Sequence, residues 1–288
     1  MSLLWRRLLL WGSIAVALTL IWAVARVYAE PTDTLDIGIT GDDYLWMETF
    51  QTQAEAVAAY FVTIEPFKSN ASLMRFFIVP TQRDLYCSRS STISRVIVCN
   101  GTVVRDVFTE AGYDPDKILV LWNTSTYGGS GGDFVCTSYT GSQMKPVAAH
   151  ECLGHTIGTL ADEYLSSSFS APNQDTWFGQ CWKGEQPPDY VGTWVQRCNY
   201  PNFWRQQVLT STGLKNSLMY SLSTPRFNTR SIEYMLPHIN RMSDPFRMPP
   251  VVELAADETD GIAPLSVTLT ARGVALNGGP LTYAWSWN

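Results

Sequence analysis

Three residues that could form a zinc-dependent hydrolytic site, His150, Glu151 and His155, lie within one six-residue stretch of this 288-residue chain. Neutral imidazoles bind zinc, and a glutamate beside them can take a proton from a zinc-bound water. The carboxylates of Asp162 and Glu163 follow, beyond a glycine at which the chain can turn back. The chain has only three histidines, so this grouping does not come from a His-rich composition. The stretch predicts a metal site with two imidazoles and one carboxylate as ligands.

The spacing of the two histidines differs from the usual zinc motif, in which they are four residues apart. His150 and His155 are five residues apart, which places them about 140° apart around a regular α-helix. A π-bulge that absorbs one residue would return both rings to one face, and such bulges are frequent at functional sites. We therefore predict a non-α turn between residues 150 and 155. The alternative is a pair of ordinary helical histidines, and the third histidine, His238, is assigned no role.

The elements around this stretch alternate between strands and helices, according to the spacing of apolar side chains. Such alternation predicts a three-layer α/β domain, which we place over residues 30–245. The irregular part of this domain is expected over residues 166–215, which are rich in Ser, Pro, Trp and Gly. Strands are predicted over residues 35–41, 73–79, 93–98, 118–122 and the segment DFVCTS from residue 133, and helices over 43–64, 102–112, the histidine stretch and 229–242.

A glycine-rich loop, YGGSGGDF, occupies residues 127–134. It lacks the lysine of a phosphate-binding loop. It does match G-x-S-x-G around Ser130, but that nucleophile motif needs a helix directly after the serine, and a strand is predicted here. We therefore interpret the loop as a rim of the substrate cleft beside an edge strand rather than as a serine-hydrolase motif.

The amino terminus, residues 1–29, predicts a signal peptide or a membrane anchor. Arg6 and Arg7 precede an apolar run over residues 8–25, and small residues suited to cleavage follow. The run is long for a signal core and near the minimum for a spanning helix, so both interpretations stay open. In either case the rest of the chain is exported: it is secreted, or held at the cell surface by residues 8–25.

An exported chain meets an oxidising compartment, in which its six cysteines are expected to form disulfides. Pairing nearest neighbours predicts two disulfides and leaves two cysteines over: Cys87–Cys99 and Cys181–Cys198, with Cys136 and Cys152 remaining. Cys152 lies inside the histidine motif. For this residue a disulfide or a buried thiol is favoured over a thiolate ligand.

The charge balance bears on possible partners. The chain has 20 Lys and Arg residues against 26 Asp and Glu residues, for a net charge of −6, and it has no Lys/Arg-rich run. Nucleic acid is therefore not a predicted partner. A protein or peptide substrate is expected instead.

The chain ends in a segment, residues 250–288, that follows the proline-rich linker DPFRMPP. Apolar and polar residues alternate in it between turn signals, as in an antiparallel β module. Its APL…VTL and GPLTYAWSW stretches resemble the start of a PKD-type β-sandwich repeat. The segment is too short for a complete sandwich, so we predict a truncated β-sandwich segment and assign it no activity.

Over residues 35–240 the chain resembles the M64 family of metallopeptidases, which includes immunoglobulin A peptidases. The family's motifs are matched here by Gly41-Asp42-Asp43-Tyr44, by ILVLWNTSTYGGSGG (118–132), by His155, Gly158, Leu160, Asp162, Glu163 and Tyr164, and by Ser217-Leu218-Met219 with Phe227-Asn228. The resemblance implies a zinc endopeptidase with a mixed-sheet, zincin-like α/β fold and helices on the sheet. It implies no particular substrate.

The resemblance also indicates roles for single residues. It favours Asp162 over Glu163 as the third Zn²⁺ ligand beside His150 and His155, with Glu151 as the general base. Glu163 could instead orient a ligand histidine. Two further residues have a functional and a structural interpretation: Met219 lies under the metal or is an ordinary core methionine, and Tyr164 donates to the oxyanion or, as we favour, only packs.

One departure from the family pattern leaves two functions open. The family's first histidine corresponds to Glu151, because one residue is inserted between Glu151 and His155. A bulge would restore an active zinc peptidase, which we favour because every other motif is present. Otherwise the site is altered, and the chain is a catalytically impaired, metallopeptidase-like surface-binding protein.

Overall fold

The computed structural model describes residues 34–165, 177–187, 192–243, 246, 251–256 and 269–274. The predicted signal or anchor, residues 1–29, lies outside this part of the chain, as does much of the predicted β-sandwich segment. None of the helices in the described ranges has the length and apolar character to cross a membrane.

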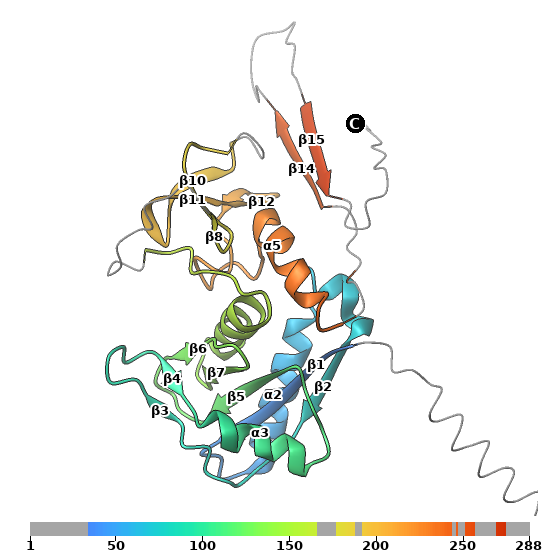
Figure 1. The fold of residues 1–288 in the computed structure, drawn as a ribbon, viewed down its shortest axis with the longest axis vertical. Coiled ribbons are helices and arrows are strands. Elements are labelled where there is room, and N and C mark those ends of the chain that lie inside the picture. The colour runs from blue at the N-terminus through green and yellow to red at the C-terminus, as the bar shows by residue number, and fades with distance from the viewer. Residues whose placement is uncertain are drawn as a thin grey trace, which may run out of the picture. The chain divides into compact units, whose positions relative to one another are not determined.

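A five-stranded sheet forms the centre of the fold, with the strand order β2-β1-β5-β7-β6 (Figure 1). Its parallel strands are β1 (Leu35–Asp42), β2 (Met74–Ile78), β5 (Lys117–Trp122) and β7 (Val135–Tyr139), and the edge strand β6 (Gly129–Ser130) runs antiparallel to β7. The fold is therefore a mixed-sheet α/β arrangement, as predicted. The apolar run of β5 is buried on both faces, because its alternate residues pack into two different clusters.

Helices cover both faces of this sheet. Leu119 and Leu121 of β5 lie in the cluster that receives α2 (Met47–Phe61), whereas Ile118 and Val120 face α3 (Gly101–Glu110). α3 begins after Asn100, whose side chain accepts hydrogen bonds from the first free backbone N–H groups of the helix. The three-layer prediction is thus confirmed for residues 35–157.

The histidine-bearing helix lies on the α2 side of the sheet. It starts as α4 (Met144–Ala148) and continues as a π-helix, η2 (Ala149–Ile157). Its apolar side chains Cys152, Leu153 and Ile157 are fully buried in the main core, together with Met235 of α5 (Thr229–Ile239). The core therefore fixes the rotation of η2 about its axis.

The described residues 177–187 and 192–215 are more regular than their sequence predicts. They form a four-stranded sheet of order β10-β11-β9-β8 and a hairpin, β12-β13. These strands are short and lack a clear period, which explains why the pattern did not show them. Their bounds are β8 (Trp177–Phe178), β9 (Cys181–Lys183), β10 (Trp194–Cys198), β11 (Tyr200–Gln206), β12 (Val208–Thr210) and β13 (Gly213–Lys215).

The remaining short elements complete the fold. The strand predicted over residues 93–98 is reduced to β4 (Ile97–Val98), which pairs with β3 (Ser88–Arg89) around a turn. A 3-10 helix, η1 (Lys68–Leu73), precedes β2. Near the C-terminus β14 (Val251–Ala256) and β15 (Leu269–Val274) pair antiparallel, in keeping with the alternating pattern of that segment.

All six cysteines form disulfides: Cys87–Cys99, Cys181–Cys198 and Cys136–Cys152. The two nearest-neighbour pairs are therefore confirmed. The third disulfide joins β7 to η2, so Cys152 is a structural cysteine and not a thiolate ligand. Three disulfides are typical of proteins in an oxidising compartment.

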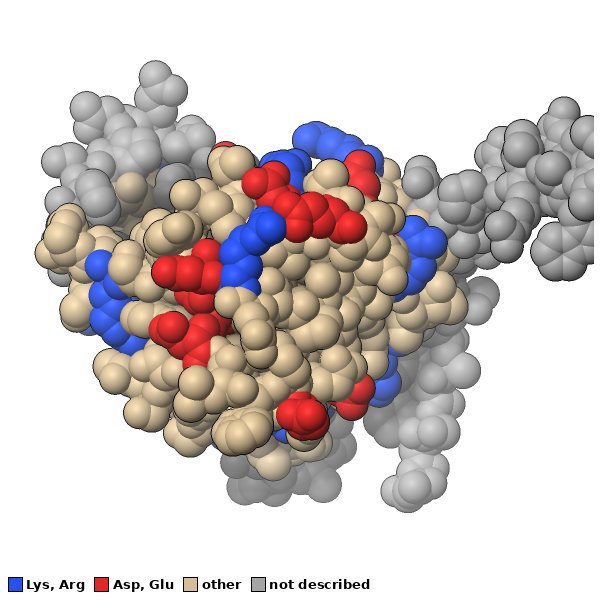
Figure 2. All heavy atoms as spheres, turned by 90° about the horizontal axis from the view of Figure 1, so that it is seen from below, with Lys and Arg blue, Asp and Glu red and all other residues tan. Residues whose placement is uncertain are grey.

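Figure 2 shows one face of the molecule, on which acidic and basic side chains are interspersed in small groups over a mostly uncharged surface. Neither sign gathers into one continuous patch among the described residues on this face.

Candidate metal centre

The π-helix η2 brings the two histidines together. A π-helix bonds residue i to residue i+5, so residues five apart lie one turn apart on the same face. Gly158 N donates to Leu153 O at 3.0 Å in this pattern. The rings of His150 and His155 have centroids 4.8 Å apart. The predicted non-α turn is therefore present.

Asp162 completes a three-residue cluster with these imidazoles. Its Oδ1 atom lies 3.1 Å from Nε2 of His150 and 3.1 Å from Nε2 of His155, and the two Nε2 atoms are 3.2 Å apart. Tetrahedral zinc with bonds of about 2.0–2.1 Å separates its ligand atoms by about 3.3 Å. The three atoms thus lie at the spacing of a zinc-binding triangle, and the donor set fits this metal.

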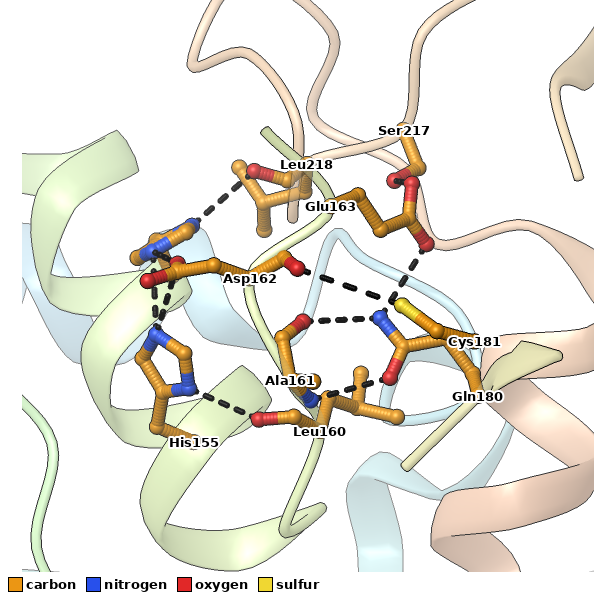
Figure 3. Close-up of polar contacts among 10 residues, drawn as sticks. His155, Leu160, Ala161, Asp162, Glu163, Gln180, Cys181, Ser217 and Leu218 are labelled. Carbon is orange, nitrogen blue, oxygen red and sulfur yellow. Dashed lines mark hydrogen bonds and ion pairs between the residues drawn. The ribbon is translucent and has the colours of Figure 1, made fainter. Parts of the chain in front are cut away.

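Backbone carbonyls orient both rings. Nδ1 of His150 lies 3.0 Å from Leu218 O, and Nδ1 of His155 lies 2.7 Å from Leu160 O. A carbonyl oxygen only accepts, so each Nδ1 must carry a proton, and each Nε2 is the ring atom that a metal ion next to Asp162 would bind. Such partners fix the tautomer and direction of metal-binding histidines. Figure 3 shows Leu160 and Leu218 on either side of Asp162.

Asp162 and Glu163 point in opposite directions (Figure 3). Asp162 faces the imidazoles, whereas Glu163 is fully buried. The carboxylate of Glu163 accepts hydrogen bonds from the hydroxyl of Ser217 at 2.5 Å and from the side-chain amides of Asn228 and Gln180 at 2.8 and 3.2 Å. The structure therefore brings Asp162, and not the alternative Glu163, to the histidines.

The pKa values of His155 and Asp162 are both shifted in the direction that favours their charged forms. Although burial opposes a charged ring, the hydrogen bond to Asp162 and its negative charge raise the pKa of His155 to about 9. Burial also opposes charge on Asp162, but the hydrogen bonds from the two imidazoles hold the pKa of this carboxyl well below its usual range. A proton is thus strongly attracted to the point where the three atoms meet. A metal ion would take the place of that proton.

Glu151 lies beside the cluster in a cleft of about 550 Å³. The cleft is also lined by His150, His155 and Asp162. Burial raises the pKa of the Glu151 carboxyl, and the neighbouring imidazoles oppose this rise. A carboxylate with a raised pKa is better matched to proton transfer near neutral pH.

The glycine-rich loop forms a wall of this cleft through β6. A Cβ atom at Gly131, directly after β6, would lie 2.3 Å from the Cβ atom of His155, so only glycine lets the loop approach η2 this closely. The hydroxyl of Ser130 donates to Ile97 O at 2.5 Å, and strand β7 follows the loop instead of a helix. These contacts exclude the nucleophile-elbow interpretation and agree with the cleft-rim interpretation.

Of the remaining candidate residues, Met219 and His238 lie outside the lining of the cleft, whereas Tyr164 is part of it. Met219 is fully buried, and its sulfur lies so close to Gly154 that a Cβ atom there would be 2.4 Å away. The Tyr164 ring lies parallel to the His150 ring, with centroids 6.3 Å apart, and lines the cleft. His238 lies on α5 with its ring 5.2 Å from that of Tyr234 and is not part of the cluster.

Several residues that support the site were not predicted. The side-chain amide of Gln180 forms two hydrogen bonds with the backbone of Ala161. Its Oε1 accepts from Ala161 N at 2.9 Å, and its Nε2 donates to Ala161 O at 2.8 Å. Asn228 caps α5 and also donates to Glu163. Gln180 lies in a segment without a clear period, so no local signal marks it. Asn228 was visible only as part of the family resemblance.

No family model matches the chain, and no curated protein does. Among solved structures, archaemetzincin (amzA) from Methanopyrus kandleri is similar at 13% identity, with a TM-score of 0.29, over 50% of this chain and 85% of that chain. So low a TM-score supports no assignment of activity. The M64 and PKD resemblances stay predictions.

Proposed function

We propose that the protein is an exported zinc-dependent peptidase. The observation that carries this proposal is the convergence of two imidazole nitrogens and one carboxylate oxygen within 3.2 Å of one another, beside Glu151 in an open cleft. The choice of peptide bonds as substrate rests on the resemblance to the M64 family. The proposed peptidase domain spans residues 30–245.

The chain's own residues have separate roles in this proposal. His150, His155 and Asp162 would hold the metal. Bound zinc supplies Lewis-acid polarisation of a carbonyl and lowers the pKa of water. Glu151 accepts the proton of the attacking water and returns it to the departing amine nitrogen. Leu160 and Leu218 keep both imidazoles in the tautomer that leaves Nε2 free.

Export is part of the proposal. The three disulfides support an oxidising location, and the predicted signal or anchor over residues 1–29 would supply the route. Residues 250–288 are proposed as a PKD-like spacer segment without activity.

The test compares Glu151→Gln with the wild-type protein. We expect the wild-type protein to bind one zinc ion per chain and to cut peptides in a broad library. Glu151→Gln should keep the zinc and lose about 10²–10⁴-fold in kcat, because an amide cannot accept the proton. His155→Ala should lose both zinc and activity. Zinc content is measured by mass spectrometry, and cleavage by analysis of the library products.

The matched control is Glu48→Gln, at an exposed position in the first turn of α2, which should behave as wild type. If the wild-type protein binds stoichiometric zinc and cuts no member of the library, the surface-binding interpretation replaces the peptidase.

A further inference from the structure

A small hairpin carries a positive charge into the cleft. The hairpin comprises β3, β4 and the turn between them, and the disulfide Cys87–Cys99 closes its base. It supplies Ile93, Arg95 and Val96 to the lining of the cleft. The hairpin thus contributes to the candidate site although it lies more than 50 residues before His150 in the sequence.

Several contacts fix the backbone of this hairpin to the rim of the cleft. The guanidinium of Arg89 donates to Ser94 O at 2.8 Å and to Tyr127 O at 2.9 Å. Gly129 N of β6 donates to Arg95 O at 3.0 Å. Residue 95 is therefore held against the strand that packs on η2.

Arg95 is the only Lys or Arg among the described residues that line the cleft. The acidic residues of the same lining are Glu151 and Asp162, and Asp162 is already bonded to the two imidazoles. In the described part of the chain Arg95 forms no ion pair, and its side chain is exposed. Its positive charge lowers the pKa of the Tyr164 hydroxyl and of the Glu151 carboxyl, against the larger effect of burial, so the guanidinium lies near both groups.

An exposed guanidinium that lines the cleft and forms no ion pair among the described residues is suited to bind a carboxylate of the substrate. Arginine binds carboxylates through two parallel hydrogen bonds. Arg95 lines the same cleft as Tyr164 and Glu151, and its charge acts on the Glu151 carboxyl, so this binding would lie near the proposed general base.

We propose that Arg95 selects peptides that carry a carboxylate next to the scissile bond, either an acidic side chain or the C-terminal carboxylate of a short peptide. This inference rests on the proposed peptidase function and names the substrate class of the same site.

The test uses pairs of fluorogenic peptides that differ by Glu or Gln at each position near the cleaved bond, each with a free or an amidated C-terminus. We expect kcat/KM of the wild-type protein to favour the carboxylate-bearing member of at least one pair by about tenfold or more, the usual effect of a charge-assisted hydrogen bond. A Glu-over-Gln preference identifies an acidic side chain. A free-over-amidated preference identifies the terminal carboxylate.

Three variants connect the preference to Arg95. In Arg95→Gln the ratio within each pair should fall to about one, and in Arg95→Lys part of the preference should remain. Arg95→Glu should reverse the preference, because a carboxylate at residue 95 repels the carboxylate-bearing peptide of each pair. The control Arg83→Gln removes an exposed arginine that pairs with Glu110 outside the cleft, and it should keep the wild-type ratio. Equal cleavage within every pair by the wild-type protein, or an unchanged ratio in Arg95→Gln, would overturn the inference and leave the peptidase proposal standing.

A binding measurement separates the two proposals. The same peptides are titrated into zinc-loaded Glu151→Gln, with and without Arg95→Gln. If no peptide is cut by the wild-type protein but the carboxylate preference appears in binding and disappears with Arg95→Gln, the peptidase proposal fails and the Arg95 site is retained. If no carboxylate preference appears in binding, the Arg95 site is rejected.

Discussion

At the scale of single residues, Glu163 fixes the direction of its neighbour Asp162. The Glu163 carboxylate accepts hydrogen bonds from four side chains, and its backbone N–H donates to Met219 O at 2.9 Å. On the other side of Asp162, Gln180 holds Ala161 by two hydrogen bonds. Asp162 therefore lies between two anchored residues, and its side chain has little freedom to leave the imidazoles.

This arrangement predicts that Glu163→Ala will weaken both folding and metal binding. The truncation removes the acceptor of the buried Ser217 hydroxyl and one of the two acceptors of each side-chain amide of Gln180 and Asn228, which costs about 3–5 kcal/mol in the free energy of unfolding. Zinc affinity should fall at least about tenfold if the direction of Asp162 is lost. Urea unfolding and competition with a zinc chelator measure the two effects.

Two controls accompany this prediction. Glu163→Gln keeps an acceptor oxygen in the network and should retain most of the zinc affinity. Glu110→Ala removes an exposed carboxylate from a surface ion pair and should change stability by less than about 1 kcal/mol. Wild-type zinc affinity in a folded Glu163→Ala protein would show that Asp162 is held by other means.

At the scale of elements, the π-helix η2 is built into its surroundings. The disulfide Cys136–Cys152 ties it to β7, and Leu153 and Ile157 are fully buried in the core. Gly131 of the loop after β6 packs directly against His155. The extra residue between Glu151 and His155 is therefore part of the site's geometry.

Deletion of Leu153 tests this interpretation. The deletion restores the usual spacing of His150 and His155, but it rotates the part of the helix before Gly154 by about 100° relative to the rest. His150 would lose Leu218 O, and Cys152 would no longer face Cys136. We expect zinc binding and activity to be lost, as zinc analysis and circular dichroism of the purified protein would show.

The matched variant is Leu153→Ala, which removes the same side chain and keeps the helix register. It should cost about 2–5 kcal/mol in unfolding free energy and still bind zinc while folded. A deletion variant with full zinc affinity would mean that the surrounding core tolerates both helix registers and that the π-turn has no role.

At the scale of the whole molecule, the charges of the cleft couple metal binding to folding. The raised pKa of His155, about 9 in the folded state against its ordinary 6.5, adds stability below pH 6.5 that is lost as the pH rises through 9. The lowered pKa of Asp162 adds stability at pH values above the ordinary pKa of an aspartate. This stability is lost as the pH falls toward the lowered pKa of the folded state. The metal-free protein should therefore be most stable at mildly acidic pH.

Melting temperatures in EDTA and in zinc, from pH 5 to about 9.5, test this coupling. We expect the EDTA sample to lose stability between about pH 6.5 and 9, while the stabilisation by zinc grows with pH because the metal displaces a proton from His155. In His155→Ala the loss in EDTA should be much smaller. A constant melting temperature of the wild-type EDTA sample over this range would show that the cluster does not hold the proton.

Much of the site and of the central sheet can be predicted from sequence, because the signals are local. Apolar runs of strand length, as over residues 118–122, predict strands buried on both faces, and the same reasoning found β1, β2 and β7. The five-residue spacing of His150 and His155 predicted a non-α turn, because helical geometry alone decides which residues share a face.

Only the tertiary structure decided the rest, because those features depend on which distant segments meet. Asp162 and Glu163 are chemically alike neighbours, and the donors from Ser217 and Asn228 direct Glu163 away from the candidate metal site. Arg95 lies in a turn without any motif, and it reaches the cleft only because its hairpin is fixed to β6. By itself, the sequence determined the ligand types and their spacing. The packing of β6, the hairpin and residues 217–228 around η2 decided which groups face the cleft, since long-range contacts leave no periodic signal.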